Sequence, residues 1–203
     1  MKLYTMPGAC STACHIMLLE VKADFVSIVV NLRDKTLPDG ASYLDVNPKG
    51  QVPALLLEDG ALLTEVAVIL QYLADRFERT DLLASAGTME RYKTLSAVNY
   101  IATEFHKTFS PLLRPFTPED FKEQTRNMLL PRVLASLDAQ LVHQPYLAGD
   151  HFTIADIYAF VVLSWARIAN LSLEPWPTLD SYMMRVGARD SIREAYKSVV
   201  VPA

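Results

Sequence analysis

Both cysteines of this 203-residue chain lie near its beginning, in the stretch YTMPGACSTACH (residues 4–15). Three residues separate Cys10 from Cys14, whereas dithiol oxidoreductases use a Cys-x-x-Cys spacing with two. Zinc is also a poor fit, because His15 follows Cys14 directly and the other histidines lie far away at unrelated spacings. We therefore predict no metal site and two reduced thiols.

The predicted elements around them separate the two cysteines. Residues 2–5 form a short strand pattern, and residues 11–23 carry apolar side chains at helical spacing. Cys10 would then lie at a helix N-terminus, where unpaired N–H groups and the helix dipole lower the pKa of a thiol. Cys14 would lie one turn inside the helix, where a buried and inert thiol is the more common case. The residues alone leave open whether Cys10 is functional or only marks the turn from strand to helix.

The rest of the first 80 residues continues to mix strand and helix patterns. Residues 25–32 are rich in β-branched side chains, and residues 54–65 contain two apolar runs around Asp59-Gly60, a pair suited to a hairpin turn. A helical pattern follows over residues 65–77, and residues 78–88 resemble a linker. These patterns predict a small α/β unit whose sheet contains both parallel and antiparallel strands.

Beyond residue 88 the chain has a helical period throughout. Residues 89–109 and 118–142 predict long helices, the second with a kink at Pro131. In DHFTIADIYAF, Thr153 and Asp156 have the spacing of a capping box, so a further helix should begin near Ile154. Two flanking apolar residues have the positions of a hydrophobic staple: Phe152 and Ile157. We interpret this motif as structural and not as a site of chemistry.

Composition indicates an ordinary globular protein. Apolar residues make up 51% of the chain, charged residues 21%, and the net charge is only -4, which argues against nucleic acid as a partner. The most apolar stretch, residues 157–166, ends at Arg167 and is shorter than the roughly 20 residues that a membrane span needs. Pro7 interrupts the N-terminus before a signal peptide could form, so we expect a cytoplasmic protein with no membrane partner.

Taken together, these segments resemble a bacterial glutathione S-transferase, most closely the beta class with its cysteine. The segments that carry the resemblance are KLYTMPGACS (2–11), NPKGQVPALLLEDGALLTE (47–65), ILQYLAD (69–75), NYIATEFHKTFSPL (99–112) and AGDHFTIADIYAF (148–160). The resemblance implies a thioredoxin-like N-terminal domain with a mixed sheet over residues 1–80, followed by an all-α domain over residues 88–203. It also implies a homodimer with its active site in the cleft between the domains.

The same resemblance implies the site residues. Cys10 and His106 would be catalytic, with His106 as a base or an orienting group for a thiol. Glutathione, the co-substrate, would be bound by the remaining members of the pattern: Lys35, Gln51, Val52, Pro53, Glu65, Val66, Asn99, Glu104 and Lys107. Asn99 and Glu104 could reach the glutathione of the neighbouring subunit.

Several of these positions have a physical reason to bind a charged tripeptide. Glu65 can pair with the γ-glutamyl ammonium, while the N–H groups of residues 65 and 66 face its carboxylate. Val66 replaces the small or hydroxyl residue common in the family, so any contact there must come from its backbone. Val52-Pro53 resembles the family's cis-proline turn, which exposes backbone groups to the cysteinyl unit.

Thr5 is a second departure, because the beta class commonly has tyrosine there. Tyr4 cannot replace it, since neighbouring residues of a strand face opposite sides. This disfavours activation by tyrosine and leaves Cys10 as the principal reactive group.

The resulting hypothesis is conjugation of glutathione to small hydrophobic electrophiles in detoxification, with thiol transfer or peroxide reduction as side activities. An aromatic pocket for the electrophile would draw on residues of the helical half: Phe109, Leu113, Phe116 and Trp165. For Trp165 a place in the core is the preferred interpretation. The alternatives are a glutathione-dependent isomerase, dehalogenase or disulfide reductase on the same fold, and a non-catalytic carrier of apolar ligands.

Overall fold

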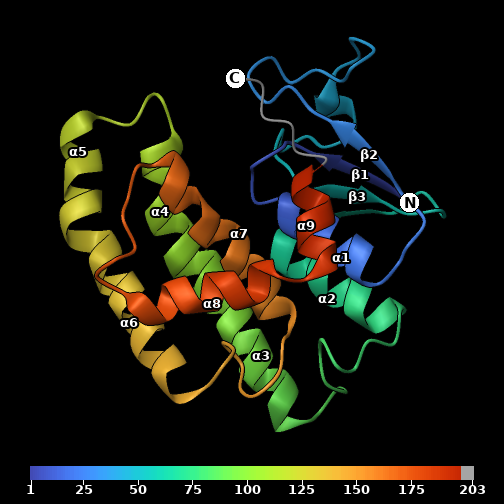
Figure 1. Ribbon diagram of the computed structural model, residues 1–203. Coiled ribbons are helices and arrows are strands. Elements are labelled where there is room, and N and C mark those ends of the chain that lie inside the picture. The colour runs from blue at the N-terminus through green and yellow to red at the C-terminus, as the bar shows by residue number, and fades with distance from the viewer. Residues whose placement is uncertain (198–203) are drawn as a thin grey trace. The chain divides into compact units, whose positions relative to one another are not determined.

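The computed structural model describes residues 1–197, which pack into two compact units. The first unit contains residues 1–79 together with the last helix, α9 (Asp190–Lys197), and the second contains residues 80–189 (Figure 1). The sequence pattern assigns the last helix to the helical half, whereas its packing groups it with the N-terminal unit. The domain limits 1–80 and 88–203 therefore stay a prediction.

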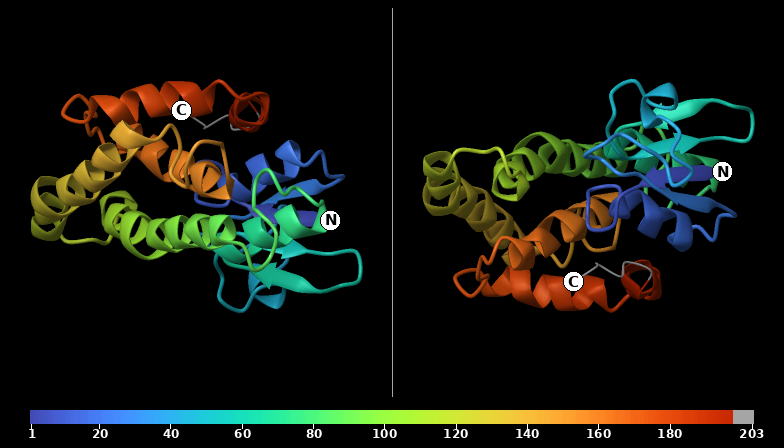
Figure 2. Two further views of the ribbon diagram at one scale, coloured as in Figure 1. Left: turned by 90° about the horizontal axis from the view of Figure 1, so that it is seen from below. Right: turned by 90° about the horizontal axis from the view of Figure 1, so that it is seen from above.

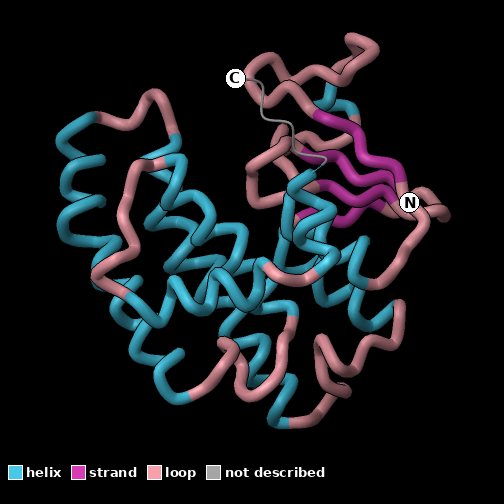
Figure 3. Tube along the Cα trace, in the orientation of Figure 1, coloured by secondary structure: helices cyan, strands magenta, loops and turns pink. Residues whose placement is uncertain are grey.

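All strands of the described chain lie in the first unit and form one mixed sheet (Figure 3). The strands are β1 (Lys2–Thr5), β2 (Val26–Val29), β3 (Ala54–Leu56) and β4 (Leu62–Thr64). Their order is β2-β1-β3-β4, with β1 parallel to β2 and antiparallel to β3. The expected hairpin joins β3 to β4: the Asp59 carboxylate accepts the Ala61 N–H at 2.9 Å, and Gly60 has a φ of 88°. The predicted mixed sheet is thus confirmed.

Three longer helices and a short 3₁₀ turn complete the first unit. They are α1 (Thr12–Glu20), η1 (Tyr43–Asp45), α2 (Val66–Arg76) and α9. Helix α1 packs against both α2 and α9. It ends three residues earlier than its apolar pattern suggests, because Lys22 adopts a φ of 53° and the Ala23 N–H closes back on the Leu18 carbonyl.

The second unit is helical, and two of its long helices change geometry part-way. Tyr100 ends α3 (Met89–Tyr100), which continues through a π-helical segment, η2 (Ile101–Phe105), into α4 (His106–Leu113). The second helix consists of α5 (Glu119–Gln124), the π-helical η3 (Thr125–Leu129) and α6 (Leu130–His143). The irregularity expected at Pro131 therefore takes the form of a widened turn just before it, as suits a residue that lacks an N–H and clashes with the preceding turn.

Helix α7 (Ile154–Ile168) is the central helix of the second unit. It begins where the capping box predicts, with the Thr153 hydroxyl and the Asp156 carboxylate both bonded to backbone amides. It lies between α3 and α4 on one side and α8 (Pro177–Gly187) on the other (Figure 2). Among residues 1–197, no helix is long and apolar enough to cross a membrane.

Candidate functional site

The turn between β1 and α1 is organised by a buried hydroxyl. The Ser11 oxygen accepts the Thr5 hydroxyl at 2.9 Å and the Met6 N–H at 3.1 Å, and it donates to the Met6 carbonyl at 3.3 Å. Ser11 is fully buried and Thr5 is 6% exposed. Thr5, the departure from the beta-class pattern, therefore has a definite place: its hydroxyl fixes the turn that carries Cys10.

The two thiols have different environments, as the sequence suggests. Cys14 is fully buried, and burial raises the pKa of its thiol well above the ordinary value. Cys10 is half-buried, and its thiol donates to the Val52 carbonyl with Sγ and O 3.6 Å apart. The expectation of unpaired amides beside Cys10 is wrong for the first two helical residues: the Thr12 and Ala13 N–H groups donate to the Ala9 and Cys10 carbonyls, since the chain enters α1 through tight turns.

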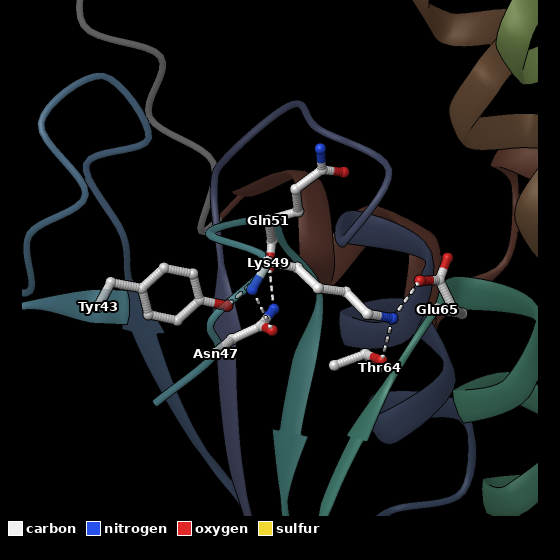
Figure 4. Close-up of polar contacts among 6 residues, drawn as sticks. All are labelled: Tyr43, Asn47, Lys49, Gln51, Thr64 and Glu65. Atoms are coloured by element: carbon white, nitrogen blue, oxygen red, sulfur yellow. Dashed lines mark hydrogen bonds and ion pairs between the residues drawn. The ribbon is translucent and has the colours of Figure 1, made fainter. Parts of the chain in front are cut away.

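The Val52-Pro53 bond is cis, as the resemblance implies. The carbonyl just before this turn is held by two side chains (Figure 4). Gln51 O accepts the Tyr43 hydroxyl at 2.8 Å and the Asn47 amide at 2.7 Å. Burial raises the pKa of Tyr43, so its hydroxyl stays protonated as a donor. The Gln51 side chain itself is exposed and points away from these contacts (Figure 4).

Glu65 lies between β4 and α2, and its carboxylate pairs with a lysine (Figure 4). The Lys49 ammonium is 3.0 Å from the Glu65 carboxylate and 3.1 Å from the Thr64 hydroxyl. Both charged side chains are more than half exposed. Glu65 has a φ of 72°, an unusual conformation for a residue with a side chain. Val66 is only 5% exposed, which leaves its backbone, not its side chain, for any contact with a ligand.

Lys35 belongs to the same part of the first unit. Its ammonium donates to the Gly50 carbonyl at 2.7 Å, and its backbone carbonyl accepts the Tyr43 N–H at 2.8 Å. It also has a positive φ, of 56°. Lys35 is therefore tied to the loop before the cis-proline turn.

The candidates of the second unit follow one another along the first long helix. Asn99, Glu104 and Lys107 are exposed, whereas His106 is half-buried at the first position of α4. His106 Nδ1 lies 2.7 Å from the Tyr158 hydroxyl of α7. The π-helical segment η2 comes immediately before His106, and such segments are frequent at functional sites.

The four aromatic and apolar candidates for an electrophile pocket have unequal environments. Phe109 is fully buried and Trp165 is 3% exposed, with their ring centroids 6.1 Å apart. Leu113 is half-buried, and Phe116 is 78% exposed. Trp165 therefore belongs to the core, as preferred above. A cavity of about 420 Å³ lies elsewhere in this unit, between α3 and α6, and none of these four residues lines it.

Comparison with known proteins decides the family. Residues 8–76 match the model of the glutathione S-transferase N-terminal domain, and residues 100–190 match that of the C-terminal domain. The chain belongs to the glutathione S-transferase family. It is 47% identical over 195 residues to the Escherichia coli O157:H7 protein named glutathione S-transferase GstA, covering 96% of each chain.

Solved transferases agree with this assignment. A sphingomonad glutathione S-transferase complexed with glutathione has a TM-score of 0.94 and 37% identity, covering 100% of both chains. A beta-class transferase from Sphingomonas chungbukensis has a TM-score of 0.95 and 38% identity, again over 100% of both chains. The predicted thioredoxin-like unit followed by a helical unit is thus confirmed as the glutathione S-transferase fold.

In this glutathione S-transferase, sequence reasoning missed several polar residues around the predicted ones. Lys49, Asn47 and Tyr43 bond to Glu65 or to the Gln51 carbonyl, and Tyr158 bonds to His106. Lys49 and Asn47 stand in the NPKGQVP segment that carries the resemblance, so this segment could have indicated that they belong to the site. Tyr158 likewise stands in the AGDHFTIADIYAF segment, whereas Tyr43 lies outside all of these segments and had no such signal.

Proposed function

We propose that this protein transfers glutathione to small hydrophobic electrophiles. The observation that carries the proposal is the contact between the half-buried Cys10 thiol and the carbonyl of Val52 in the cis-proline turn. It combines a reactive group with a backbone edge suited to pair with the peptide of glutathione. Family membership and the glutathione-bound relative support the same activity.

Glutathione is bound mainly by the first unit in this proposal. The Glu65 carboxylate pairs with the γ-glutamyl ammonium, exchanging its Lys49 partner for the ligand, and the amides at the start of α2 receive the carboxylate. Val52 pairs through its backbone with the cysteinyl unit. Further contacts come from the remaining residues of the pattern: Lys35, Gln51, Pro53, Val66, Asn99, Glu104 and Lys107.

The chemistry is nucleophilic substitution or addition by sulfur. The glutathione thiolate rests beside Cys10. Its proton goes either to water, with His106 donating a hydrogen bond to the sulfur, or to His106 itself. The sulfur lone pair forms a bond to an electrophilic carbon, and with a haloarene the halide leaves with the bonding pair. Positioning and a lowered thiol pKa supply the acceleration.

Assembly and location belong to the proposal as well. We infer a cytoplasmic homodimer, on the basis of the family resemblance and the sequence pattern. Light scattering coupled to size-exclusion chromatography measures the mass directly, and the 22.7 kDa calculated for one chain would contradict the dimer.

The decisive experiment measures glutathione conjugation with a chlorodinitrobenzene and binding to immobilised glutathione. We expect Glu65→Gln to reduce retention and activity, because it removes the charge that pairs with the ammonium. Glu174→Gln, which removes a charge from an exposed glutamate outside the pattern, should retain both. Absence of conjugation together with absence of retention by the unchanged protein would overturn the proposal.

Thiol transfer is a second candidate, favoured by the partial exposure of Cys10. In that reaction the Cys10 thiolate attacks the glutathione sulfur of a mixed disulfide, and the other thiol leaves as a thiolate. A second glutathione then attacks the Cys10 mixed disulfide, releasing oxidised glutathione and restoring the Cys10 thiol. Turnover of a mixed disulfide that Cys10→Ser abolishes, while conjugation survives, would assign this activity to Cys10.

A further inference from the structure

We propose that Tyr158 is a positioning residue for His106, and that its hydroxyl donates to Nδ1 and thereby keeps the imidazole proton on Nε2. The role of this proton in catalysis rests on the proposed function, in which His106 acts at the glutathione sulfur. The position of the proton in the folded protein does not require a substrate.

The His106 ring is held by contacts from helix α7. Its Nδ1 lies 2.7 Å from the Tyr158 hydroxyl, a short distance for a hydrogen bond to nitrogen. Its centroid is 4.9 Å from that of Trp165, with the ring planes at 71°. Tyr158 and Trp165 are seven residues apart on α7, so they lie on one face of that helix. Phe109, on the same helix as His106, also contacts Trp165, with the ring centroids 6.1 Å apart.

The surrounding side chains have little freedom to move. Tyr158 and Trp165 are each 3% exposed, and Phe109 is fully buried. A buried tyrosine hydroxyl has to find a hydrogen-bond partner, and Nδ1 is within reach. Tyr158 therefore fixes the rotation of the half-buried imidazole as well as one of its nitrogens.

The direction of this hydrogen bond determines the tautomer. A neutral imidazole has one donor nitrogen and one acceptor nitrogen. The phenol is the more acidic partner and the imidazole nitrogen is the more basic one, so the stronger pairing has the Tyr158 O–H donating to Nδ1. The ring proton then resides on Nε2.

This assignment chooses between the two roles considered for His106. A nitrogen that carries a proton donates a hydrogen bond, so His106 Nε2 stabilises a thiolate that has already formed and does not remove the thiol proton. The glutathione proton leaves to water, and no change of tautomer is needed during turnover. His106 is then a donor set in place by Tyr158.

Nitrogen-15 NMR tests the proton position directly. Two-bond proton–nitrogen correlations of the intact protein at about pH 8.5, where imidazole is neutral, report the Nε2–H to Nδ1–H ratio. The chain has four histidines, and the signals of His106 are those absent from His106→Gln. We expect the Nε2–H form to dominate and Tyr158→Phe, which removes only the hydroxyl, to lower the ratio roughly fivefold.

A matched control separates this effect from a general disturbance. Tyr92→Phe removes the same hydroxyl from a tyrosine that is 56% exposed, and it should leave the His106 signals unchanged. A dominant Nδ1–H form in the unchanged protein, or a ratio that Tyr158→Phe leaves unaltered, would overturn the proposal.

A second measurement uses amide substitutions in the conjugation assay. Glutamine places an N–H near the position of Nε2, whereas leucine offers no hydrogen bond. A donor role predicts that His106→Gln keeps about tenfold more activity than His106→Leu. Equal loss in both variants, with both folded by circular dichroism, would contradict the donor role. If the unchanged protein conjugates nothing, the proposed function fails, while the nitrogen signals still decide the tautomer.

Discussion

Replacement of Asp156 by alanine should destabilise the protein strongly, because its carboxylate is the hub of a buried network. It accepts the Leu147 N–H at 2.9 Å, the Thr153 N–H at 2.9 Å and the Thr153 hydroxyl at 3.0 Å. It also accepts the Tyr182 hydroxyl at 2.9 Å. Asp156 is fully buried, and so is Tyr182.

The magnitude follows from what the substitution leaves behind. The Leu147 amide, the Thr153 amide and the Tyr182 hydroxyl would all lose a buried acceptor, at about 1–3 kcal/mol for each group. Part of this cost is offset, because burial raises the pKa of Asp156 and therefore opposes its charged form in the folded protein. We expect a net loss of about 3–5 kcal/mol, the lower part of the roughly 3–9 kcal/mol that the three lost acceptors would give without this offset.

Urea unfolding followed by circular dichroism measures this loss. Protein concentration must be the same for all variants, since assembly would contribute to apparent stability. Asp180→Ala serves as the control, because Asp180 is an exposed acid in the first turn of α8 and should cost less than about 1 kcal/mol. A loss below about 1 kcal/mol for Asp156→Ala would refute the view that this network anchors α7.

Three further outcomes are expected from the first unit. Burial lowers the pKa of His15 below its ordinary value, so protonation of His15 favours the unfolded chain. The contribution of neutral His15 to stability should be complete above about pH 6.5 and lost as pH falls through the lowered pKa. Urea titrations at several pH values should show this decline in the free energy of unfolding, and His15→Gln should flatten it. Iodoacetamide should label Cys10 in the native protein and Cys14 only after denaturation, and mass spectrometry of the peptides would expose a reversed order. Lys49→Met should change the free energy of unfolding by less than about 1 kcal/mol in urea, since the Lys49–Glu65 pair is exposed, and a larger loss would mean that the pair is structural.

Local patterns predicted the elements whose stabilisation is local. The Asp59-Gly60 turn and the Thr153–Asp156 capping box need only residues close in sequence, and both occur where expected. The change to π-helical geometry at Ile101–Phe105 had no such signal, because its apolar residues fit an ordinary helix as well. The early end of α1 was missed for a similar reason, because a lysine gives no indication in the sequence that it will adopt a positive φ.

The sequence predicted the chemistry of the site only where a single residue type is enough to indicate a role. The cysteine beside a helix start could be singled out from the chain itself, and the family pattern added Glu65 and Val52-Pro53. The partners that hold these groups come from distant segments. Tyr43 and Tyr158, for example, are ordinary aromatic residues until the fold brings their hydroxyls to an acceptor.

The π-helical segment Ile101–Phe105 changes the winding of the first long helix of the second unit. The His106 N–H bonds to the carbonyl five residues back instead of four, so one residue more than usual is wound into that turn. If the same five residues wound as a regular α-helix, everything that follows would turn by about 100° about the axis. The imidazole of His106 would then leave the face that meets α7, although its neighbours in sequence are unchanged, so the segment before it sets the orientation of this histidine.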